Sequence, residues 1–135
     1  MRLKATPEAG KYLHLAFDEN KGSISYDEWG GYDGAFLQGA SFVEGRNGGY
    51  AAKLVKSNKS YIELPKGAVS RLSDYTIATW IKITAGRGRI FDFGSGSGTF
   101  MIAAANSTGV KYKITCEKGA FDFTVPCKWT TTDWH

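Results

Sequence analysis

The chain has 135 residues, a length that suits one domain with a hydrophobic core, and it contains 17 glycines but only 3 prolines. Charged residues make up 22% of the chain, which excludes the composition of a disordered protein. The net charge of +4 comes from scattered Lys and Arg residues, and the densest basic segment, 53–59, has the pattern of solvated strand edges and a turn. A nucleic-acid-binding face needs a denser basic stripe, so we expect no nucleic-acid partner.

The sequence has neither an apolar run long enough to span a membrane nor, at Met1–Glu8, the apolar core of a signal peptide. We therefore expect no membrane insertion, and the protein is either cytosolic or an internal module of a longer secreted protein. Two cysteines, Cys116 and Cys127, have no His or Cys partner at a zinc-binding spacing. Two free, buried thiols are expected, with a disulfide across neighbouring strands as the alternative.

Alternation of side-chain types with a period of two predicts short strands along the first half of the chain. Strands are expected at 11–17, 24–26, 35–37, 41–44, 50–55 and 60–64. The last two flank a Lys-Ser-Asn-Lys turn and are predicted to form a hairpin. A Gly-rich loop with acidic and aromatic residues occupies 27–34.

The clearest alternation lies at 75–83, and we predict that this strand pairs with 90–93 across the Gly-Arg-Gly-Arg turn at 86–89. Trp80 is the expected core anchor of this central hairpin, because no other side chain in the segment can bury as much apolar surface. Further strands are expected at 100–105, 110–116 and 121–125, and Trp129 and Trp134 are expected in the core. Many short strands joined by glycine turns, without a convincing helix, predict an antiparallel β-sandwich.

The last residues, Asp133–His135, have the pattern of the beginning of another strand. One interpretation is a final strand that finishes early. The other, which we favour, is a domain that lacks its last strands. Such a fragment would leave sheet edges open, and open edges predict pairing with another chain, including a second copy of this one.

Five segments occur in an order that resembles a known family: Leu15–Gly22, Tyr61–Pro65, Tyr75–Lys82, Arg89–Gly94 and Trp134–His135. The series is similar to the laminin-G-like, concanavalin A-like jelly rolls of bacterial secreted proteins. The resemblance implies an all-β antiparallel sandwich of jelly-roll type, formed as one domain over 1–135 and truncated at its C-terminus. It also implies an extracellular or cell-surface location within a longer secreted protein. The superfamily includes lectins, carbohydrate-binding modules, adhesion domains and some hydrolases, so it leaves the function open.

Catalytic patterns are weak in this sequence. Glycoside hydrolases need two carboxylates that flank the scissile bond, whereas the adjacent pairs Asp18-Glu19 and Asp27-Glu28 would point to opposite faces of a strand. The Gly-Ser-Gly-Ser-Gly run at 94–98 lies between two expected strands, so it lacks the helix of a phosphate-binding or nucleophile loop. We expect a flexible hairpin loop there and no enzyme activity, with a glycoside hydrolase as a lesser alternative.

Carboxylates at the end of the first strand and in the following loop supply the oxygen ligands that calcium prefers. Modules similar to this one hold a structural calcium near the first strand, and Asp18 and Asp33 are the best candidate ligands. Turn chemistry alone also explains acidic residues at these positions.

Loop aromatics are the remaining candidates for a binding site. Rings that stack on sugars, with neighbouring polar groups that bond hydroxyls, are expected among Trp29, Tyr32, Tyr50, Arg46 and Asn47. The alternative is that these aromatics pack over the edge of the sandwich. The leading hypothesis is a non-catalytic, lectin-like carbohydrate-binding module whose partner is a polysaccharide or glycan. The second is a protein-interaction or structural module of a surface protein that uses its open sheet edges.

Overall fold

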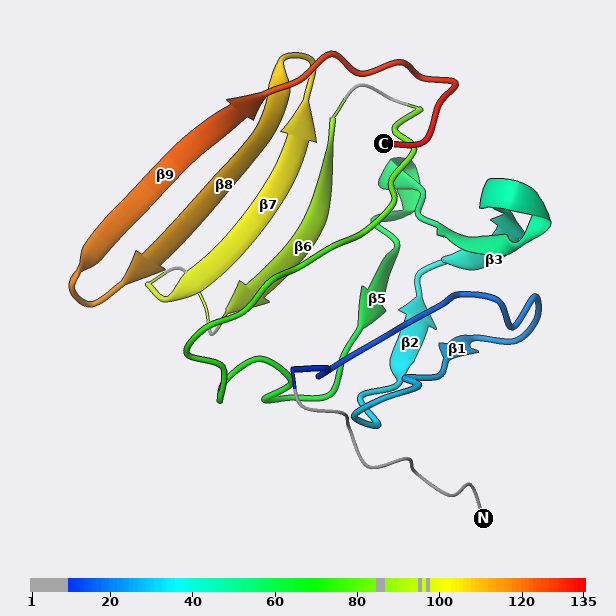
Figure 1. Cartoon of the computed structure of the whole chain (residues 1–135), viewed down its shortest axis with the longest axis horizontal. Helices are drawn as coiled ribbons and strands as arrows, with labels where there is room; N and C mark the ends of the chain where they lie inside the picture. The colour runs from blue at the N-terminus through cyan, green and yellow to red at the C-terminus, as the bar shows by residue number, and fades with distance from the viewer. Residues whose placement is uncertain (1–9, 85–86, 95, 97) are drawn as a thin grey trace. The chain divides into compact units, whose positions relative to one another are not determined.

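The computed structural model describes residues 10–84, 87–94, 96 and 98–135 (Figure 1). The chain divides into two compact units, 1–73 and 74–135. Within the described residues every strand pairing is antiparallel and no α-helix is present. The all-β, antiparallel prediction is confirmed, whereas the jelly-roll sandwich stays a prediction. The N-terminal residues Met1–Glu8, part of the turn at 86–89 and part of the loop at 94–98 lie outside the described residues.

The first unit contains a three-stranded and a two-stranded sheet. The larger sheet has the order β1-β2-β5, from β1 (Ile24–Ser25), β2 (Gly34–Leu37) and β5 (Tyr61–Glu63). Phe36 on β2 is buried, and its ring centroid lies 4.4 Å from that of Phe42 and 6.3 Å from that of Phe17. These rings form the small apolar core of the unit.

The second sheet of this unit is a hairpin of β3 (Ser41–Glu44) and β4 (Tyr50–Lys53), joined by the 3-10 turn η1 (Arg46–Gly48). The predicted hairpin of 50–55 with 60–64 is wrong, because β4 pairs with β3 and β5 pairs with β2. The 3-10 turn η2 (Lys56–Asn58) between them ends in a left-handed residue, Lys59, with φ 54°. It leads the chain from one sheet to the other instead of folding it back.

The strand predicted at 11–17 is also wrong. Only Leu15 makes a β-bridge, with Asp27, and Phe17 has a φ of 61°, outside the strand region. The N–H of His14 is bound by a side chain, the carboxylate of Asp27, rather than by a neighbouring strand. A side chain thus replaces the ladder that the alternation predicted.

The second unit is a four-stranded meander of order β6-β7-β8-β9. Its strands are β6 (Gly88–Gly94), β7 (Phe100–Asn106), β8 (Gly109–Cys116) and β9 (Gly119–Pro126). The three strands predicted from residue 100 onward are confirmed. The predicted central hairpin is wrong, since β6 pairs with β7 and residues 74–83 form no regular strand.

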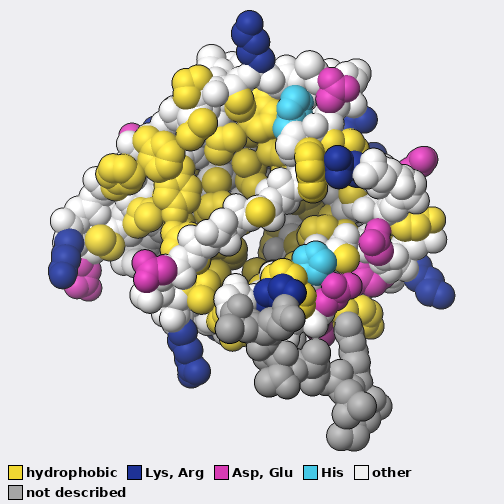
Figure 2. All heavy atoms as spheres, in the orientation of Figure 1, with side chains coloured by type: hydrophobic (Ala, Val, Ile, Leu, Met, Phe, Trp, Pro, Cys, Tyr) yellow, Lys and Arg dark blue, Asp and Glu magenta, His cyan; other side chains and the backbone are white. Residues whose placement is uncertain are grey.

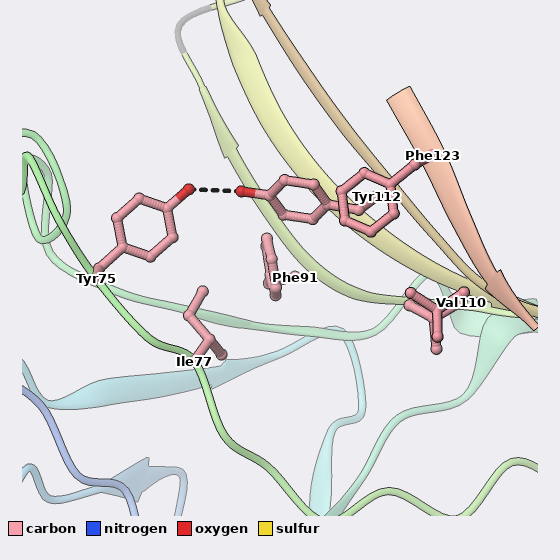
Figure 3. Close-up of a pocket in the computed structure, with 7 residues that line it drawn as sticks. Tyr75, Ile77, Phe91, Val110, Tyr112 and Phe123 are labelled. Atoms are coloured by element: carbon pink, nitrogen blue, oxygen red, sulfur yellow. Dashed lines mark hydrogen bonds between the residues drawn. The ribbon is translucent and has the colours of Figure 1, made fainter. Parts of the chain in front are cut away.

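Residues 74–83 contact the sheet by side chains. The Tyr75 hydroxyl hydrogen-bonds to the Tyr112 hydroxyl and to Met101 Sδ, and Ile77 lies over the same face (Figure 3). Trp80 is an odd number of residues from Tyr75 and Ile77, so in an extended segment its side chain points to the other side. It is 57% exposed, and its prediction as the core anchor is therefore wrong. The backbone of Ile81 exchanges two hydrogen bonds of 2.9 Å with His135.

Strand register gathers apolar side chains on one face of the four-stranded sheet. In the view of Figure 2 hydrophobic side chains cover the surface over these strands. Phe121, Phe123 and Val125 on β9 are 62%, 43% and 52% exposed. The opposite face carries Lys111, Lys113, Asp122 and Thr124.

Residues near the C-terminus are less buried than predicted. Trp129 and Trp134 are only half-buried, which corrects their placement in the core. Cys116 and Cys127 are free as expected, but Cys116 is exposed and Cys127 is half-buried. Among the described residues no helix has the length and apolar character to cross a membrane.

Candidate functional site

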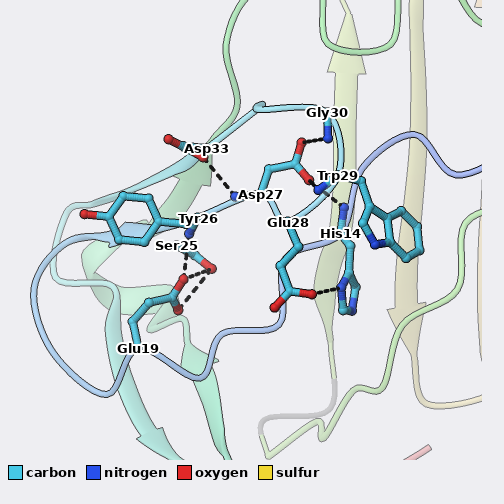
Figure 4. Close-up of polar contacts among 9 residues, drawn as sticks. All are labelled: His14, Glu19, Ser25, Tyr26, Asp27, Glu28, Trp29, Gly30 and Asp33. Atoms are coloured by element: carbon cyan, nitrogen blue, oxygen red, sulfur yellow. Dashed lines mark hydrogen bonds and ion pairs between the residues drawn. The ribbon is translucent and has the colours of Figure 1, made fainter. Parts of the chain in front are cut away.

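Asp27 organises the most extensive polar network of the first unit (Figure 4). Its side chain is buried, with 5% exposure. The carboxylate accepts hydrogen bonds of 2.8–2.9 Å from the backbone N–H groups of His14, Trp29, Gly30 and Tyr32. The N–H of Asp27 itself donates to Asp33 Oδ1 at 2.9 Å. One buried carboxylate therefore fixes the loop at 26–33 and ties it to the segment at 11–17.

Burial alone would raise the pKa of Asp27, and this is the largest single influence on it. The four backbone N–H donors together outweigh burial and hold the pKa of Asp27 below its ordinary value. The ionised form is therefore the one that the fold binds.

This shift predicts acid sensitivity. Because the pKa is lowered in the folded state, the stabilisation from Asp27 is complete above about pH 5 and is lost as pH falls below about 4. Thermal unfolding midpoints measured from pH 7 to pH 2 should stay nearly constant down to about pH 5 and decrease below about pH 4. In Asp27→Asn this decrease should be smaller. Asp133, whose pKa is also lowered, leaves a residual slope. An unchanged acid profile in the variant would contradict the assignment.

Aromatic rings from the loop and from the segment at 11–17 pack in pairs. Tyr12 and Tyr32 stack with centroids 5.2 Å apart, and their hydroxyls are hydrogen-bonded at 2.9 Å. His14 stacks on Trp29 at 4.8 Å, and His14 Nδ1 lies 2.8 Å from Glu28 Oε2. We call Tyr12, His14, Glu28, Trp29 and Tyr32 the aromatic loop cluster. The side chains of His14 and Glu28 are 44% and 52% exposed, so the cluster lies at the surface.

A glycine permits this packing. A Cβ on residue 30 would lie 2.4 Å from the carbonyl oxygen of Tyr12, so only Gly30 allows the loop to approach so closely. Tyr12 and His14 were not predicted as site residues. Their signal in the sequence was the face that Tyr12 and His14 share with Ala16, where two polar-tipped rings do not suit an apolar core.

The other predicted sugar-binding residues lie on the β3–β4 hairpin. Arg46 and Asn47 are in η1, and Tyr50 begins β4 with 37% exposure. The structure therefore divides the predicted residues into two groups, Trp29 and Tyr32 in the loop and Arg46, Asn47 and Tyr50 on the hairpin.

The predicted calcium ligands bind backbone groups of different segments. Asp18 Oδ1 accepts the N–H of Tyr50 at 3.0 Å, and Asp33 Oδ1 accepts that of Asp27. Among the described His, Cys, Asp and Glu residues, no group of three or more has the arrangement to hold a metal ion. Asp18 and Asp33 each bind a backbone N–H, and calcium binding stays a prediction that enters no step below.

A shallow hollow of about 240 Å³ is lined by Ala16, Asp18, Glu19, Tyr26 and Glu28. The carboxylate of Glu19 is held by the Ser25 hydroxyl and the Tyr26 N–H. Glu28 belongs to both the hollow and the aromatic loop cluster. Fixed carboxylates and packed rings are thereby placed in one surface region.

The second unit has an apolar groove of about 340 Å³ between the 74–83 segment and the sheet (Figure 3). Its lining residues are Tyr75, Ile77, Phe91, Val110, Tyr112, Phe123 and Val125. Burial, followed by the hydrogen bond between the Tyr112 and Tyr75 hydroxyls, raises the pKa of Tyr112 to about 12. The groove therefore presents apolar carbon and two hydroxyls, of Tyr75 and Tyr112, that are hydrogen-bonded to each other.

Comparison of the chain with protein-family models, with curated proteins and with solved structures finds no match. The resemblance to laminin-G-like jelly rolls stays a prediction.

Proposed function

We propose that the protein is a non-catalytic carbohydrate-binding module of an extracellular or cell-surface protein. The binding site is the aromatic loop cluster together with the hollow that shares Glu28. The observation that carries the proposal is the Asp27 network, which holds Trp29 and Tyr32 in place before any ligand arrives. A loop ordered in advance loses little conformational entropy on binding.

The chemistry of the region suits a sugar. Pyranose rings have an apolar C–H face, which aromatic rings contact, and hydroxyl groups, which donate to carboxylates such as those of Asp18, Glu19 and Glu28. Lys11 Nζ lies 5.5 Å from the centroid of the Trp29 ring. A sugar that stacks on this face of Trp29 has to displace the end of Lys11, whose cation–π contact contributes about 0.5–1 kcal/mol at an exposed site.

The buried carboxyl group of the site does not suit glycoside hydrolysis. A general acid needs a raised pKa and access to the glycosidic oxygen. Asp27 has a lowered pKa and is saturated by backbone N–H groups. Its role is to position the loop.

The expected result is a saturable rise in the thermal midpoint with one member of a panel of soluble polysaccharides, because a ligand of the native state stabilises it. Trp29→Ala should weaken binding at least about tenfold, as removal of a central aromatic contact does. Trp80→Ala is the matched control, because Trp80 is also an exposed tryptophan, at 57% exposure, but belongs to the other unit. This variant should bind the polysaccharide as tightly as the wild type. No response to any polysaccharide, or equal loss in both variants, would contradict the proposal.

A second candidate function is a protein-interaction module. The observation that favours it is the exposed apolar face of the four-stranded sheet, where Phe121 and Val125 are more than half exposed. An apolar surface of this kind marks interaction sites in soluble proteins. This candidate would be favoured if no polysaccharide raised the thermal midpoint and the chain associated with itself or with another protein.

A further inference from the structure

The outer edge of β9 is a strand edge without a partner in the described residues. The sheet order ends at β9, whose eight residues are all exposed. Its register with β8 runs without a bulge from Gly109↔Pro126 to Cys116↔Gly119. Of the devices that prevent edge pairing, β9 has no bulge and no lysine; its single charged residue is Asp122, and its single proline, Pro126, is the last residue of the strand. A long, regular edge strand of this type is a template for another strand.

The β8–β9 hairpin determines which backbone groups face outward. Two residues, 117 and 118, connect Cys116 to Gly119, which makes these two residues a hydrogen-bonded pair. Every second residue of β9 then points its N–H and C=O toward β8. The hydrogen bond from Cys127 N to Thr108 O continues the same parity. The outward-facing backbone groups are those of Ala120, Asp122 and Thr124.

We propose that β9 pairs antiparallel with β9 of a second copy of this chain, with Phe123 at the two-fold axis. A two-fold interface needs a surface that is complementary to itself. The run Phe121-Asp122-Phe123-Thr124-Val125 reads apolar, polar, apolar, polar, apolar in both directions. In this register Phe121 faces the partner's Val125, and Asp122 faces the partner's Thr124. Apolar side chains then meet on one face of a continuous sheet.

Neighbouring registers are less favourable. An axis at Asp122 would place two carboxylates directly opposite each other, which destabilises a strand pair. An axis at Thr124 would place Asp122 opposite the partner's Pro126, which has no N–H to donate. In the register centred on Phe123 no two carboxylates face each other, and the partner's Pro126 lies opposite Ala120 at the end of the paired segment rather than opposite Asp122.

Charge changes at residue 124 test the dimer and its register together. Thr124→Asp would face the partner's Asp122 and should weaken the dimer, whereas Thr124→Lys should strengthen it. Each change acts twice in a symmetric dimer, so the dissociation constant should shift by roughly 2- to 30-fold in either direction. Within one copy residue 124 lies opposite Lys111, so the effects on folding of the monomer have the opposite order.

Sedimentation equilibrium of the whole chain over a concentration series measures these constants. The proposal predicts dimers that tighten in the order Thr124→Asp, wild type, Thr124→Lys, with the difference reduced by salt. Thr124→Pro removes an outward N–H without touching the β8 ladder, and should give a monomer with an unchanged far-UV spectrum. Monomers at every concentration, or the reverse order of the charge variants, would overturn it. The test is independent of sugar binding, which is assigned to the other unit.

Discussion

Asp27→Asn is expected to lower the free energy of unfolding by about 2–4 kcal/mol, because several charge-assisted hydrogen bonds in a buried place are lost together. The amide has nearly the same size as the carboxylate, so the change leaves no cavity. The NH₂ group of Asn can only donate, and it would face backbone N–H groups that now donate to the carboxylate. Amide exchange of residues 10–33 should accelerate along with the loss of stability.

Asp33→Asn is the matched control for this result. Asp33 accepts one described hydrogen bond, from the N–H of Asp27, and the amide oxygen of Asn can still accept it, so the substitution should cost at most about 1 kcal/mol. Urea unfolding measures both variants, and hydrogen exchange shows whether the loop at 26–33 opens. Equal effects of the two substitutions would mean that Asp27 does not organise the loop.

Gly109→Ala is expected to destabilise the second unit by about 3 kcal/mol, because backbone atoms of β9 occupy the space of a side chain. A Cβ on residue 109 would lie 2.1 Å from the carbonyl oxygen of Val125. Since that oxygen belongs to the β8–β9 ladder, it cannot move without separating the two strands. Loss of the ladder would also remove the edge at which the dimer is proposed.

Two other glycines of the same sheet provide controls. Around residue 88 a Cβ would meet nothing within 4 Å, so Gly88→Ala should be close to neutral. Gly119 has equally open space but a φ of 135°, so Gly119→Ala isolates the conformational cost alone. Thermal unfolding should rank the loss of stability as Gly109→Ala first, Gly119→Ala second and Gly88→Ala last. A Gly109→Ala variant as stable as Gly88→Ala would contradict the described approach of the strands.

Local alternation predicted where strands form but not how they pair. The segments that became β2, β3, β7, β8 and β9 were predicted within a few residues, because β8 and β9 have a clear two-residue period and the others are short or apolar runs bounded by glycine or polar turns. The partners of β4 and β5 depend on the left-handed Lys59, a conformation that favours Gly and Asn and that the sequence does not signal there. Pairing of 75–83 with 90–93 failed for a different reason, because the alternating side chains of 75–83 pack on a sheet face.

The candidate site was predicted only in part. Trp29 and Tyr32 were identified because aromatics in a Gly-rich loop are hard to explain as core. Tyr12 and His14 were missed because the segment at 11–17 has the alternation of a strand. What brings them to the loop is the buried carboxylate of Asp27, and a hydrogen bond between residues 14 and 27 leaves no periodic signal.

Fluorine NMR of the protein labelled with 5-fluorotryptophan tests the central claim most directly. Trp29 is the only one of the four tryptophans in the first unit, and Trp29→Phe assigns its resonance. Titration with a polysaccharide that raises the thermal midpoint should shift the Trp29 resonance saturably and leave those of Trp80, Trp129 and Trp134 in place. A titration in which the Trp29 resonance stays still while one of the other three moves would contradict the sugar site at the aromatic loop cluster.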